Sequence, residues 1–350
     1  MPPPGSGTAR GRAGAPAALL EKFMSDQTVI LGGDRLLKRF RVRGGPTAGT
    51  GLLTAVDDVS LKLVRGETLG IAGESGCGKS TLARILAGLL EPDQGRVRFN
   101  DTTLTEMSRS EARAFRRQTQ MIFQDPFSSL NPRMRAGDII AEPLVIAGQG
   151  TAAARRSSVE EIMATVGLTP EQYHRFPHEF SGGQRQRIGI ARALASSPSV
   201  IIADEPVSSL DISIQAQIIN LLQSMRTTFN LSLLIISHDL SVLRHICDRV
   251  CIMYLGAIVE SAPAAELFSH CLHPYTEALI AAIPRIRRRG ERRELILTDD
   301  IPSPLALPSG CRFHPRCRHS REICRSTPPP LELKRPGRLC ACHFSDAIFA

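Results

Sequence analysis

Residues 73–80 read Gly73-Glu74-Ser75-Gly76-Cys77-Gly78-Lys79-Ser80, and this stretch decides the fold of the 350-residue chain. It follows the apolar run Thr68–Ala72 and precedes a helix-forming stretch that begins at Thr81. Glycines let the backbone N–H groups of such a loop approach phosphate oxygens, and the dipole of the following helix favours an anion. A Gly-rich turn that arose by chance would not need to lie between an apolar strand and a helix. We therefore predict that residues 73–81 bind a nucleoside triphosphate.

Two side chains of the loop have distinct predicted roles. In the Gly-x4-Gly-Lys-Ser pattern, Lys79 reaches the β and γ phosphates of the nucleotide. The hydroxyl of Ser80 is placed to ligate Mg²⁺. The expected ligands are therefore ATP and Mg²⁺.

A second motif lies where an apolar strand ends in two carboxylates. Val200–Ala203 is followed by Asp204 and Glu205. We expect Asp204 to hold the Mg²⁺ shell, and Glu205 to orient and deprotonate the attacking water. Taken alone, the same pattern fits an ordinary strand and turn equally well.

The charge of the chain is unevenly distributed. The formal net charge is +9, but residues 45–284 hold 21 basic and 24 acidic side chains. The basic excess lies at the two ends, which favours a solvated linker or an anionic membrane surface and predicts no nucleic-acid partner. Hydrophobic residues make up 42% of the chain, as in an ordinary soluble protein, and no run of 18 apolar residues predicts a membrane span.

Alternating patterns predict an α/β fold with a largely parallel sheet. Around the loop Gly44–Gly51, short β-like runs extend from Leu36 to Val64. The further expected elements are strands Thr119–Gln124, Val200–Ala203, Leu231–Ile236 and Val250–Tyr254 and helices Ser181–Ala195, Asp211–Phe229 and Leu240–Cys247.

The composition divides the chain into three expected regions. Residues 1–26 are predicted to be disordered, with Met24 as a possible start of the native protein. Residues 27–284 form the predicted ATPase domain. Residues 285–350 form a basic linker and a small Cys- and Pro-rich C-terminal segment.

Three further motifs, in this order, resemble those of the ATP-binding subunit of an ABC transporter. They are Gln124 at a strand end, the signature Phe180-Ser181-Gly182-Gly183-Gln184, and His238 at the end of a later strand. The resemblance implies a P-loop NTPase (ABC ATPase) domain with a helical subdomain. It departs from the family pattern at Phe180, usually Leu, and at Ser209, often Ala. Every hydrolytic position holds its expected residue, so an active ATPase is implied.

The resemblance also implies roles for individual residues. Gln124 would touch Mg²⁺ and relay closure to a membrane subunit, and His238 would contact the γ-phosphate and hold the catalytic carboxylate. The signature residues Ser181, Gly182, Gly183 and Gln184 would meet a nucleotide bound by a partner subunit. Asp211, in the stretch Ser209-Leu210-Asp211, would lie in the loop that crosses the dimer interface; it could equally be a helix cap.

Phe40 is the candidate aromatic residue for stacking on adenine. Such a contact is worth about 0.5 to 1.5 kcal/mol beyond burial. Phe40 could equally be a core residue, because the loop before Thr54 leaves its alignment open.

Two segments resemble the dipeptide and oligopeptide importer branch, whose relatives also carry glutathione and nickel. They are Phe123–Pro132 and Leu272–Thr276, and the first resembles the second of the two unlike ATPase subunits. The branch implies a paralogous ATPase subunit or a second copy, two transmembrane permease subunits and an external solute-binding protein. It places the chain on the cytoplasmic face of a bacterial inner membrane. An exporter subunit and a soluble non-transport ABC ATPase are the alternatives.

The C-terminal cysteines form a candidate metal site. Cys311, Cys317, Cys324 and Cys342 have the spacing C-x5-C-x6-C-x17-C, with Cys340 as a spare. Four thiolates could hold an iron-sulfur cluster or a Zn²⁺ ion, and the neighbouring histidines leave mixed Cys/His zinc ligation open. Resemblance to the importer branch favours a [4Fe-4S] cluster. Reduced cysteines in a Pro-pinned tail are the remaining alternative.

Overall fold

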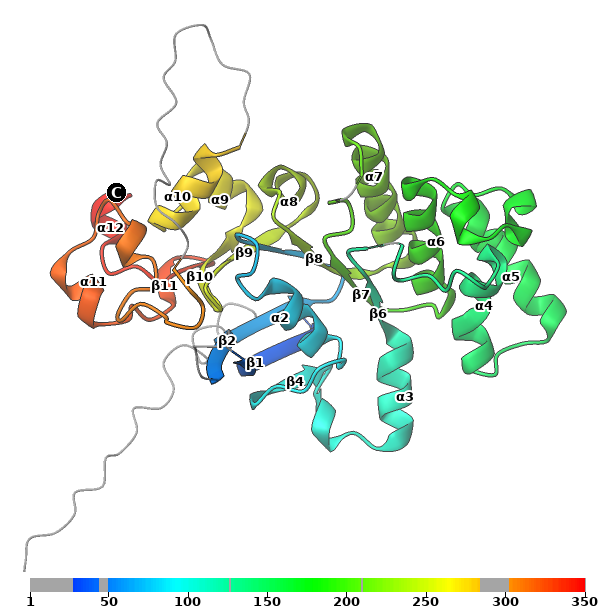
Figure 1. Ribbon diagram of the computed structural model, residues 1–350, viewed down its shortest axis with the longest axis horizontal. Coiled ribbons are helices and arrows are strands. Elements are labelled where there is room, and N and C mark those ends of the chain that lie inside the picture. Colours follow the sequence, from blue (N-terminus) through cyan, green and yellow to red (C-terminus); the bar gives the residue numbers. More distant parts are fainter. Residues whose placement is uncertain (1–27, 44–49, 126, 209, 284–301, 350) are drawn as a thin grey trace, which may run out of the picture.

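The computed structural model describes residues 28–43, 50–125, 127–208, 210–283 and 302–349 (Figure 1). The predictions for residues 1–26, for Ser209 and for the linker up to residue 301 fall on positions outside these ranges.

The main sheet runs in the order β11-β12-β10-β9-β3-β8-β7-β6. Its five strands from β9 to β6 are parallel, and β10, β12 and β11 continue it in antiparallel fashion. The strands are β3 (Thr68–Ala72), β6 (Thr119–Ile122), β7 (Val200–Asp204), β8 (Ser232–Ser237), β9 (Arg249–Tyr254), β10 (Ala257–Pro263), β11 (Glu332–Arg335) and β12 (Arg338–Cys340). The predicted α/β class with a largely parallel sheet is confirmed.

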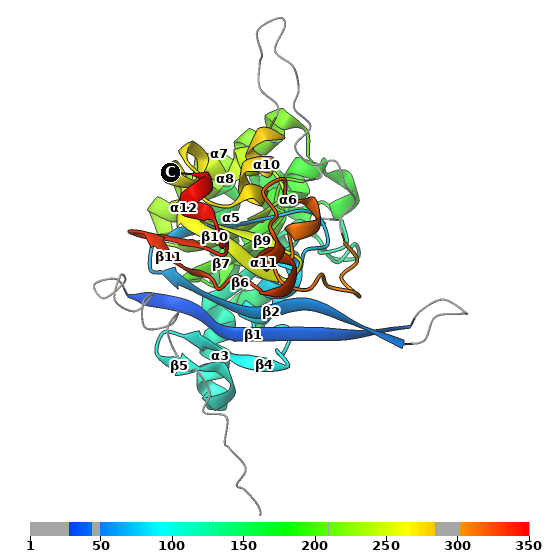
Figure 2. The same ribbon diagram turned by 90° about the vertical axis from the view of Figure 1, so that its left-hand side faces the viewer.

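A second, antiparallel sheet has the order β2-β1-β4-β5. Its strands are β1 (Val29–Arg43), β2 (Thr50–Val64), β4 (Gln94–Phe99) and β5 (Thr102–Thr103). The prediction of several short runs between Leu36 and Val64 was wrong, because β1 and β2 are each 15 residues long and pair from Val29–Val64 onward. Register shifts near Arg35, whose φ is 49°, interrupt the pattern that a continuous strand would show. Figure 2 shows both strands extending beyond the body of the molecule.

Helices cover the main sheet and form a separate group at one end. The helices α4, α5 and α6 pack on one another on the side away from the C-terminal segment (Figure 1). The α-helices are α2 (Lys79–Leu86), α3 (Arg109–Gln118), α4 (Ala136–Ile146), α5 (Ala152–Thr165), α6 (Gly182–Ala195), α7 (Ile212–Phe229), α8 (Leu240–Ile246), α9 (Ala264–Ser269), α10 (Pro274–Ala281), α11 (Glu322–Ser326) and α12 (Ser345–Ile348). Short 3₁₀ helices are η1 (Leu104–Glu106), η2 (Pro170–His174), η3 (Pro177–Glu179) and η4 (His314–Arg316).

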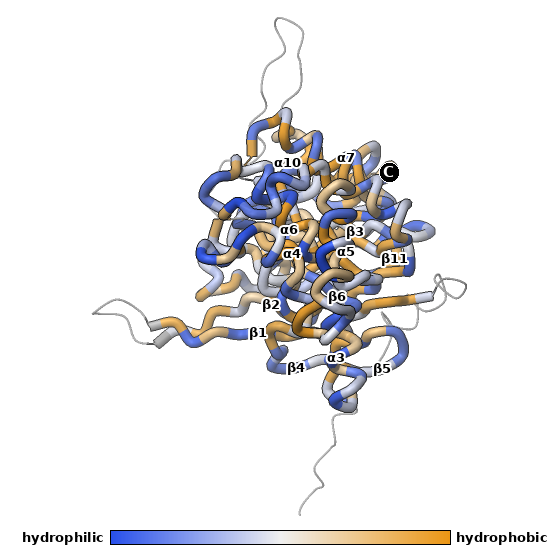
Figure 3. Tube along the Cα trace, turned by 90° about the vertical axis from the view of Figure 1, so that its right-hand side faces the viewer, coloured by the Kyte–Doolittle hydropathy of each residue, from blue (hydrophilic) through white to orange (hydrophobic). Residues whose placement is uncertain are grey.

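The core lies around the central strands. Every residue of β3, β7 and β8 is buried, because both faces of a parallel sheet are covered. Burying a Leu or Ile side chain stabilises the fold by about 1.5–3 kcal/mol, so these strands supply much of its rigidity. In the hydropathy view polar stretches lie mainly at outer turns and around α3 (Figure 3). The carboxyl ends of the parallel strands are thereby held at fixed positions.

The C-terminal segment is joined to the main sheet by strand pairing. Glu260 of β10 lies opposite Cys340 of β12 in the antiparallel register. The Glu260 carboxylate is fully buried and accepts hydrogen bonds from the backbone N–H groups of Leu272 and His273 at 2.7 and 3.0 Å. The strands of the segment therefore extend the sheet of the ATPase core.

Arg249 connects three strands at the junction of the two sheets. Its guanidinium, at the start of β9, pairs with Glu67 just before β3 at 2.8 Å and also donates to the carbonyl of Lys62 on β2. The side chains of Arg249 and Glu67 are only 18% and 12% exposed. Because both charges are largely withdrawn from water, losing one partner would leave the other uncompensated.

We expect Arg249→Met to lower the free energy of unfolding by about 3 kcal/mol, since a nearly buried carboxylate loses its partner. Denaturant unfolding measures this. Arg35→Met, which removes the exposed pair with Asp58, is the matched control and should leave stability unchanged. Equal stability of the two variants would show that the Arg249 pair contributes nothing to the junction.

Candidate functional site

The phosphate loop lies between β3 and α2, and its path needs glycine at two close approaches. Gly78 has φ = 107°, and a Cβ there would overlap the carbonyl oxygen of Ala55 on β2. A Cβ on Gly73 would overlap the carbonyl oxygen of Met253 on β9. The loop is thus packed directly against the backbone of both sheets, and its shape is fixed from behind.

Lys79 is held inside the loop. Its Nζ donates to the carbonyl oxygens of Gly73 and Glu74 at 2.8 and 2.9 Å, and the residue is 5% exposed. The loop therefore surrounds a fixed positive charge, which suits a polyphosphate.

Ser80 and Asp204 place two oxygen donors together. The Ser80 hydroxyl donates to Oδ1 of Asp204 at 2.9 Å, from the first turn of α2 to the last residue of β7. Burial raises the pKa of Asp204 above its ordinary value, while the Ser80 hydrogen bond lowers it. A hydroxyl beside a carboxylate is the kind of hard oxygen donor set that Mg²⁺ prefers, so these residues fit the predicted ion.

Glu205 carries the carboxylate on which two other predicted residues converge. Gln124 Nε2 donates to Glu205 Oε2 at 2.9 Å, and His238 Nδ1 lies 3.2 Å from the same oxygen. Glu205 has φ = 47°, and its N–H donates to the carbonyl of Ile236 at 2.9 Å. The left-handed backbone turns the carboxylate out of the sheet, where a general base would be needed.

One open cavity of about 720 Å³ is lined by Lys79, Ser80, Gln124, Glu205 and His238, but not by Asp204. Its lining residues are Phe40, Leu53, Ala55, Ser75, Gly76, Gly78, Lys79, Ser80, Thr81, Gln124, Glu205, Ser208 and His238. Sequence reasoning missed Leu53, Ala55 and Ser208. Leu53 pairs with Phe40 across the β1–β2 register, so the length of this hairpin, which the sequence pattern did not reveal, was the signal that could have found it.

The signature residues do not line this cavity. Ser181 caps α6: its Oγ accepts from the N–H of Gln184 at 3.3 Å, and Oε1 of Gln184 accepts from the N–H of Ser181 at 3.0 Å. Gly182 and Gly183 form the first turn of α6. Asp211 takes the N-cap position of α7 without a side-chain capping bond, so the expected Asp cap was wrong in that respect. None of these signature residues, nor Asp211, lines the nucleotide cavity of its own chain.

The four cysteines gather at a second place. Cys311, Cys317, Cys324 and Cys342 line one cavity of about 20 Å³, together with the side chains of His314, His319 and His343. Burial raises the pKa values of Cys311 and Cys317 to about 11 and also raises that of Cys342. Within the described ranges, no three His, Cys, Asp or Glu side chains are arranged to hold a metal ion. The residue types fit a metal, but the sulfurs would have to lose protons and draw together to bind one.

Cys340, the expected spare, has a place of its own. It is fully buried, and its Sγ lies 3.2 Å from the carbonyl oxygen of Leu272.

In the part of the chain that the structure describes, no helix has both the length and the apolar character to cross a bilayer.

Two family models match the chain. The model described as "ABC transporter" matches residues 56–208, and the model described as "Oligopeptide/dipeptide transporter, C-terminal region" matches residues 259–324. The first match contains the phosphate loop, the signature and the carboxylates of Asp204 and Glu205. The second begins on β10 and ends at Cys324.

Curated relatives match over nearly their whole length. The oligopeptide transport ATP-binding protein AppF of Bacillus subtilis is 48% identical over 91% of this chain and 98% of that protein. The dipeptide transport ATP-binding protein DppF of Haemophilus influenzae is 45% identical over 92% and 99%, respectively.

Solved structures show the same fold. The ATP-binding cassette MJ0796, in a dimeric post-hydrolysis state with ADP and Pi, has a TM-score of 0.60 and 27% identity, covering 67% of this chain and 99% of its own. CbiO1 of Clostridium perfringens, part of the ABC transporter complex cbiONQ, has a TM-score of 0.59 and 26% identity, covering 69% and 92%.

We expect Gly78→Ala to abolish nucleotide binding, because the new methyl group would collide with the Ala55 backbone and displace the loop. Gly76→Ala is the matched comparison: Gly76 also has positive φ, 77°, but a Cβ there meets nothing within 4 Å. It should cost only about 1 kcal/mol of backbone strain. Titration with a fluorescent ATP analogue measures both, and equal affinities would refute the close-approach argument.

Proposed function

The chain belongs to the ABC transporter ATP-binding proteins of the oligopeptide and dipeptide branch, and from this premise we propose that it powers the import of di- or oligopeptides or related small solutes. As a member of this family it is an ATPase that converts ATP and water to ADP and phosphate. The peptide cargo is supported by the relatives, whose names state oligopeptide or dipeptide transport. These names give no support to the exporter or to the soluble non-transport alternative.

The observation that carries the proposal is the convergence on Glu205 beside the phosphate loop. Glu205 is the general base in this proposal, and the amide of Gln124 and the imidazole of His238 fix its Oε2 at 2.9 and 3.2 Å. A base that is held in place loses little entropy when water binds, which favours proton abstraction.

The other residues of the cavity bind and orient the nucleotide. Lys79 and the loop N–H groups hold the phosphates, and Phe40, half-buried at the edge of the cavity, offers its ring to the adenine. Ser80, Asp204 and Gln124 would hold Mg²⁺, which supplies charge neutralisation at the phosphates when bound. His238 is 54% exposed, so its ring can also reach a phosphate oxygen from the solvent side.

A second ATPase subunit completes the site in this proposal. Ser181 is exposed at the N-terminus of α6, and neither it nor Asp211 reaches the cavity of its own chain. A helix N-terminus favours an anion, so the signature of a paralogous subunit or of a second copy is suited to close over the phosphates.

We place this subunit on two permease subunits at the cytoplasmic face of the inner membrane, with an external solute-binding protein delivering the cargo. Exposed apolar side chains near Gln124 and on α4 support a docking surface there: Phe127 is 63% and Ile146 81% exposed. In this proposal residues 27–284 form the ATPase unit, and residues 285–350 form an accessory segment.

We expect Glu205→Gln to lower ATP turnover by about 10²- to 10⁴-fold with ATP affinity retained, because a positioned base contributes about that much. Steady-state hydrolysis and labelled-peptide uptake in proteoliposomes with the complete transporter are the measurements. Glu106→Gln, on the exposed η1 turn, is the control. Turnover of Glu205→Gln near the wild-type value would remove Glu205 as the base; ATP-independent peptide uptake would remove the transport function.

The C-terminal cysteines are proposed as a metal site that orders the segment around η4 and α11. The support is their convergence on one cavity and the branch resemblance, which favours a [4Fe-4S] cluster over Zn²⁺. When bound, such a group would supply cross-links between the loops of this segment. Cys311, Cys317, Cys324 and Cys342 would be its ligands.

We expect anaerobically purified protein to contain about four iron and four sulfide ions per chain, with visible absorption. Cys317→Ser should lose the metal, whereas Cys271→Ser, a cysteine outside the cluster, should keep it. One zinc ion per chain would replace the iron assignment. If the wild-type protein contains neither iron nor zinc, the metal site is refuted and the four residues are reduced cysteines in the tail.

A further inference from the structure

Glu74 introduces a negative charge into a loop that must bind an anion. It follows Gly73 directly, and its side chain is 20% exposed. Like charges repel more strongly inside a protein than in water because the effective dielectric is lower, so a free carboxylate here would weaken polyphosphate binding. The phosphate loop therefore needs something that neutralises Glu74.

Arg316 supplies that neutralisation from the C-terminal segment. Its Nη1 and Nη2 donate to the two carboxylate oxygens of Glu74 at 2.8 and 3.0 Å, a bidentate pair across 242 residues of sequence. The Arg316 side chain is 4% exposed, and its Nη1 also lies 3.4 Å from the hydroxyl of Tyr254. An arginine guanidinium stays protonated in proteins, so this positive charge is permanent.

The backbone of Glu74 is held from the same side. Its N–H donates to the hydroxyl of Tyr275 on α10 at 3.0 Å. Tyr275 packs on Tyr254 and on Phe313 of the C-terminal segment, with ring centroids 4.5 and 5.3 Å away. The first residue of the loop after Gly73 is thus fixed by groups that do not line the nucleotide cavity.

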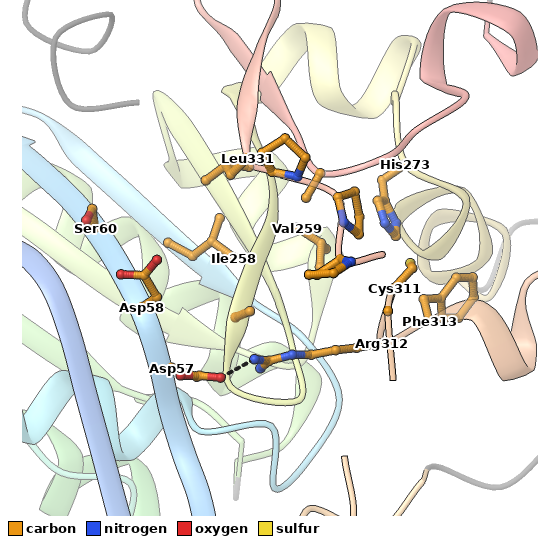
Figure 4. A pocket seen from close by; sticks show the side chains of 16 residues that line it. Asp57, Asp58, Ser60, Ile258, Val259, His273, Cys311, Arg312, Phe313 and Leu331 are labelled. Atoms are coloured by element: carbon orange, nitrogen blue, oxygen red, sulfur yellow. Dashed lines mark hydrogen bonds and ion pairs between the residues drawn. The ribbon is translucent and has the colours of Figure 1, made fainter. Parts of the chain in front are cut away.

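A second arginine of this segment, Arg312, supports the phosphate loop indirectly. Arg312 pairs with Asp57 of β2 (Figure 4). It also donates to the carbonyl of Leu255. The next residue, Gly256, donates its N–H to the carbonyl of Cys77 at 2.9 Å. The stretch 311–317 therefore supports the phosphate loop at Glu74 directly and at Cys77 through one turn.

We propose that Arg316 is a positioning residue for nucleotide binding: it cancels the charge of Glu74 and anchors the phosphate loop to the C-terminal segment. This inference rests on the proposed ATP-binding role of the loop. Arg316 acts through Glu74 and does not touch the cavity that holds the substrate. It should therefore affect the affinity for ATP far more than the chemical step.

The test is a double-mutant cycle in the full chain, read as the dissociation constant for MgATP. Arg316→Gln should weaken binding about tenfold, because the Glu74 carboxylate is left uncompensated. Glu74→Gln should bind MgATP as tightly as the wild type or more tightly, since it removes the repulsion and leaves the arginine charge. The double variant should return to within about threefold of the wild type. In the assembled transporter, Arg316→Gln should raise KM with kcat little changed.

The control is Arg318→Gln, in the same C-terminal segment as Arg316. It removes an ion pair with Glu277 of α10 that is more exposed than the Arg316–Glu74 pair, and it should leave the MgATP affinity unchanged. A double variant as weak as Arg316→Gln would overturn the proposal, because Arg316 would then act independently of Glu74. If Arg316→Gln does not fold, Glu74→Gln still decides: tenfold weaker binding would show that the carboxylate itself is needed. Wild-type protein that binds no MgATP would instead refute the proposed function.

Discussion

The close contact between the phosphate loop and the carbonyl oxygens of Ala55 and Met253 is the constraint on which the rest of the site depends. An N–H cradle binds phosphate only if its shape is set before the ligand arrives, because ordering the loop on binding would cost affinity. Here the shape is set by backbone packed on backbone, with no side chain between, at Gly73 and Gly78. One contact comes from β2 and the other from β9, so the loop inherits the rigidity of both sheets.

The sheet order then brings the chemistry to that loop. Because β7, β3 and β8 run parallel, the residues that follow them meet at one edge. Asp204 ends β7 beside Ser80, and Glu205 and His238 follow neighbouring strands. The left-handed backbone of Glu205 matters because a continuing strand would point the next side chain toward one face of the sheet and away from the strand end. The strained backbone of Glu205 therefore places its carboxylate in the nucleotide cavity.

Sequence alone predicted the parallel strands and the residues gathered at their ends. Apolar runs of strand length and a Gly-rich loop were the local signals for the strands and the phosphate loop, and the family resemblance supplied Gln124 and His238. The β1–β2 hairpin was misread because its strands face solvent in part and shift register near Arg35, which breaks the alternation. The support of the loop by Arg316 and Tyr275 was not foreseen either. Contacts across some 200 residues or more leave no local pattern in one sequence.

The C-terminal segment changes how the nucleotide site must be understood. Strand pairing at β10 and the two arginines Arg312 and Arg316 tie residues 302–349 into the ATPase core. Arg316 directly precedes Cys317, one of the four cysteines around the small cavity. A change of bonding at the Cys317 sulfur would act on the preceding residue, Arg316, whose guanidinium is bidentate to Glu74 and tolerates little displacement. The cysteine cavity and the phosphate loop are therefore linked through Arg316, which adjoins Cys317 in the chain and forms the ion pair with Glu74.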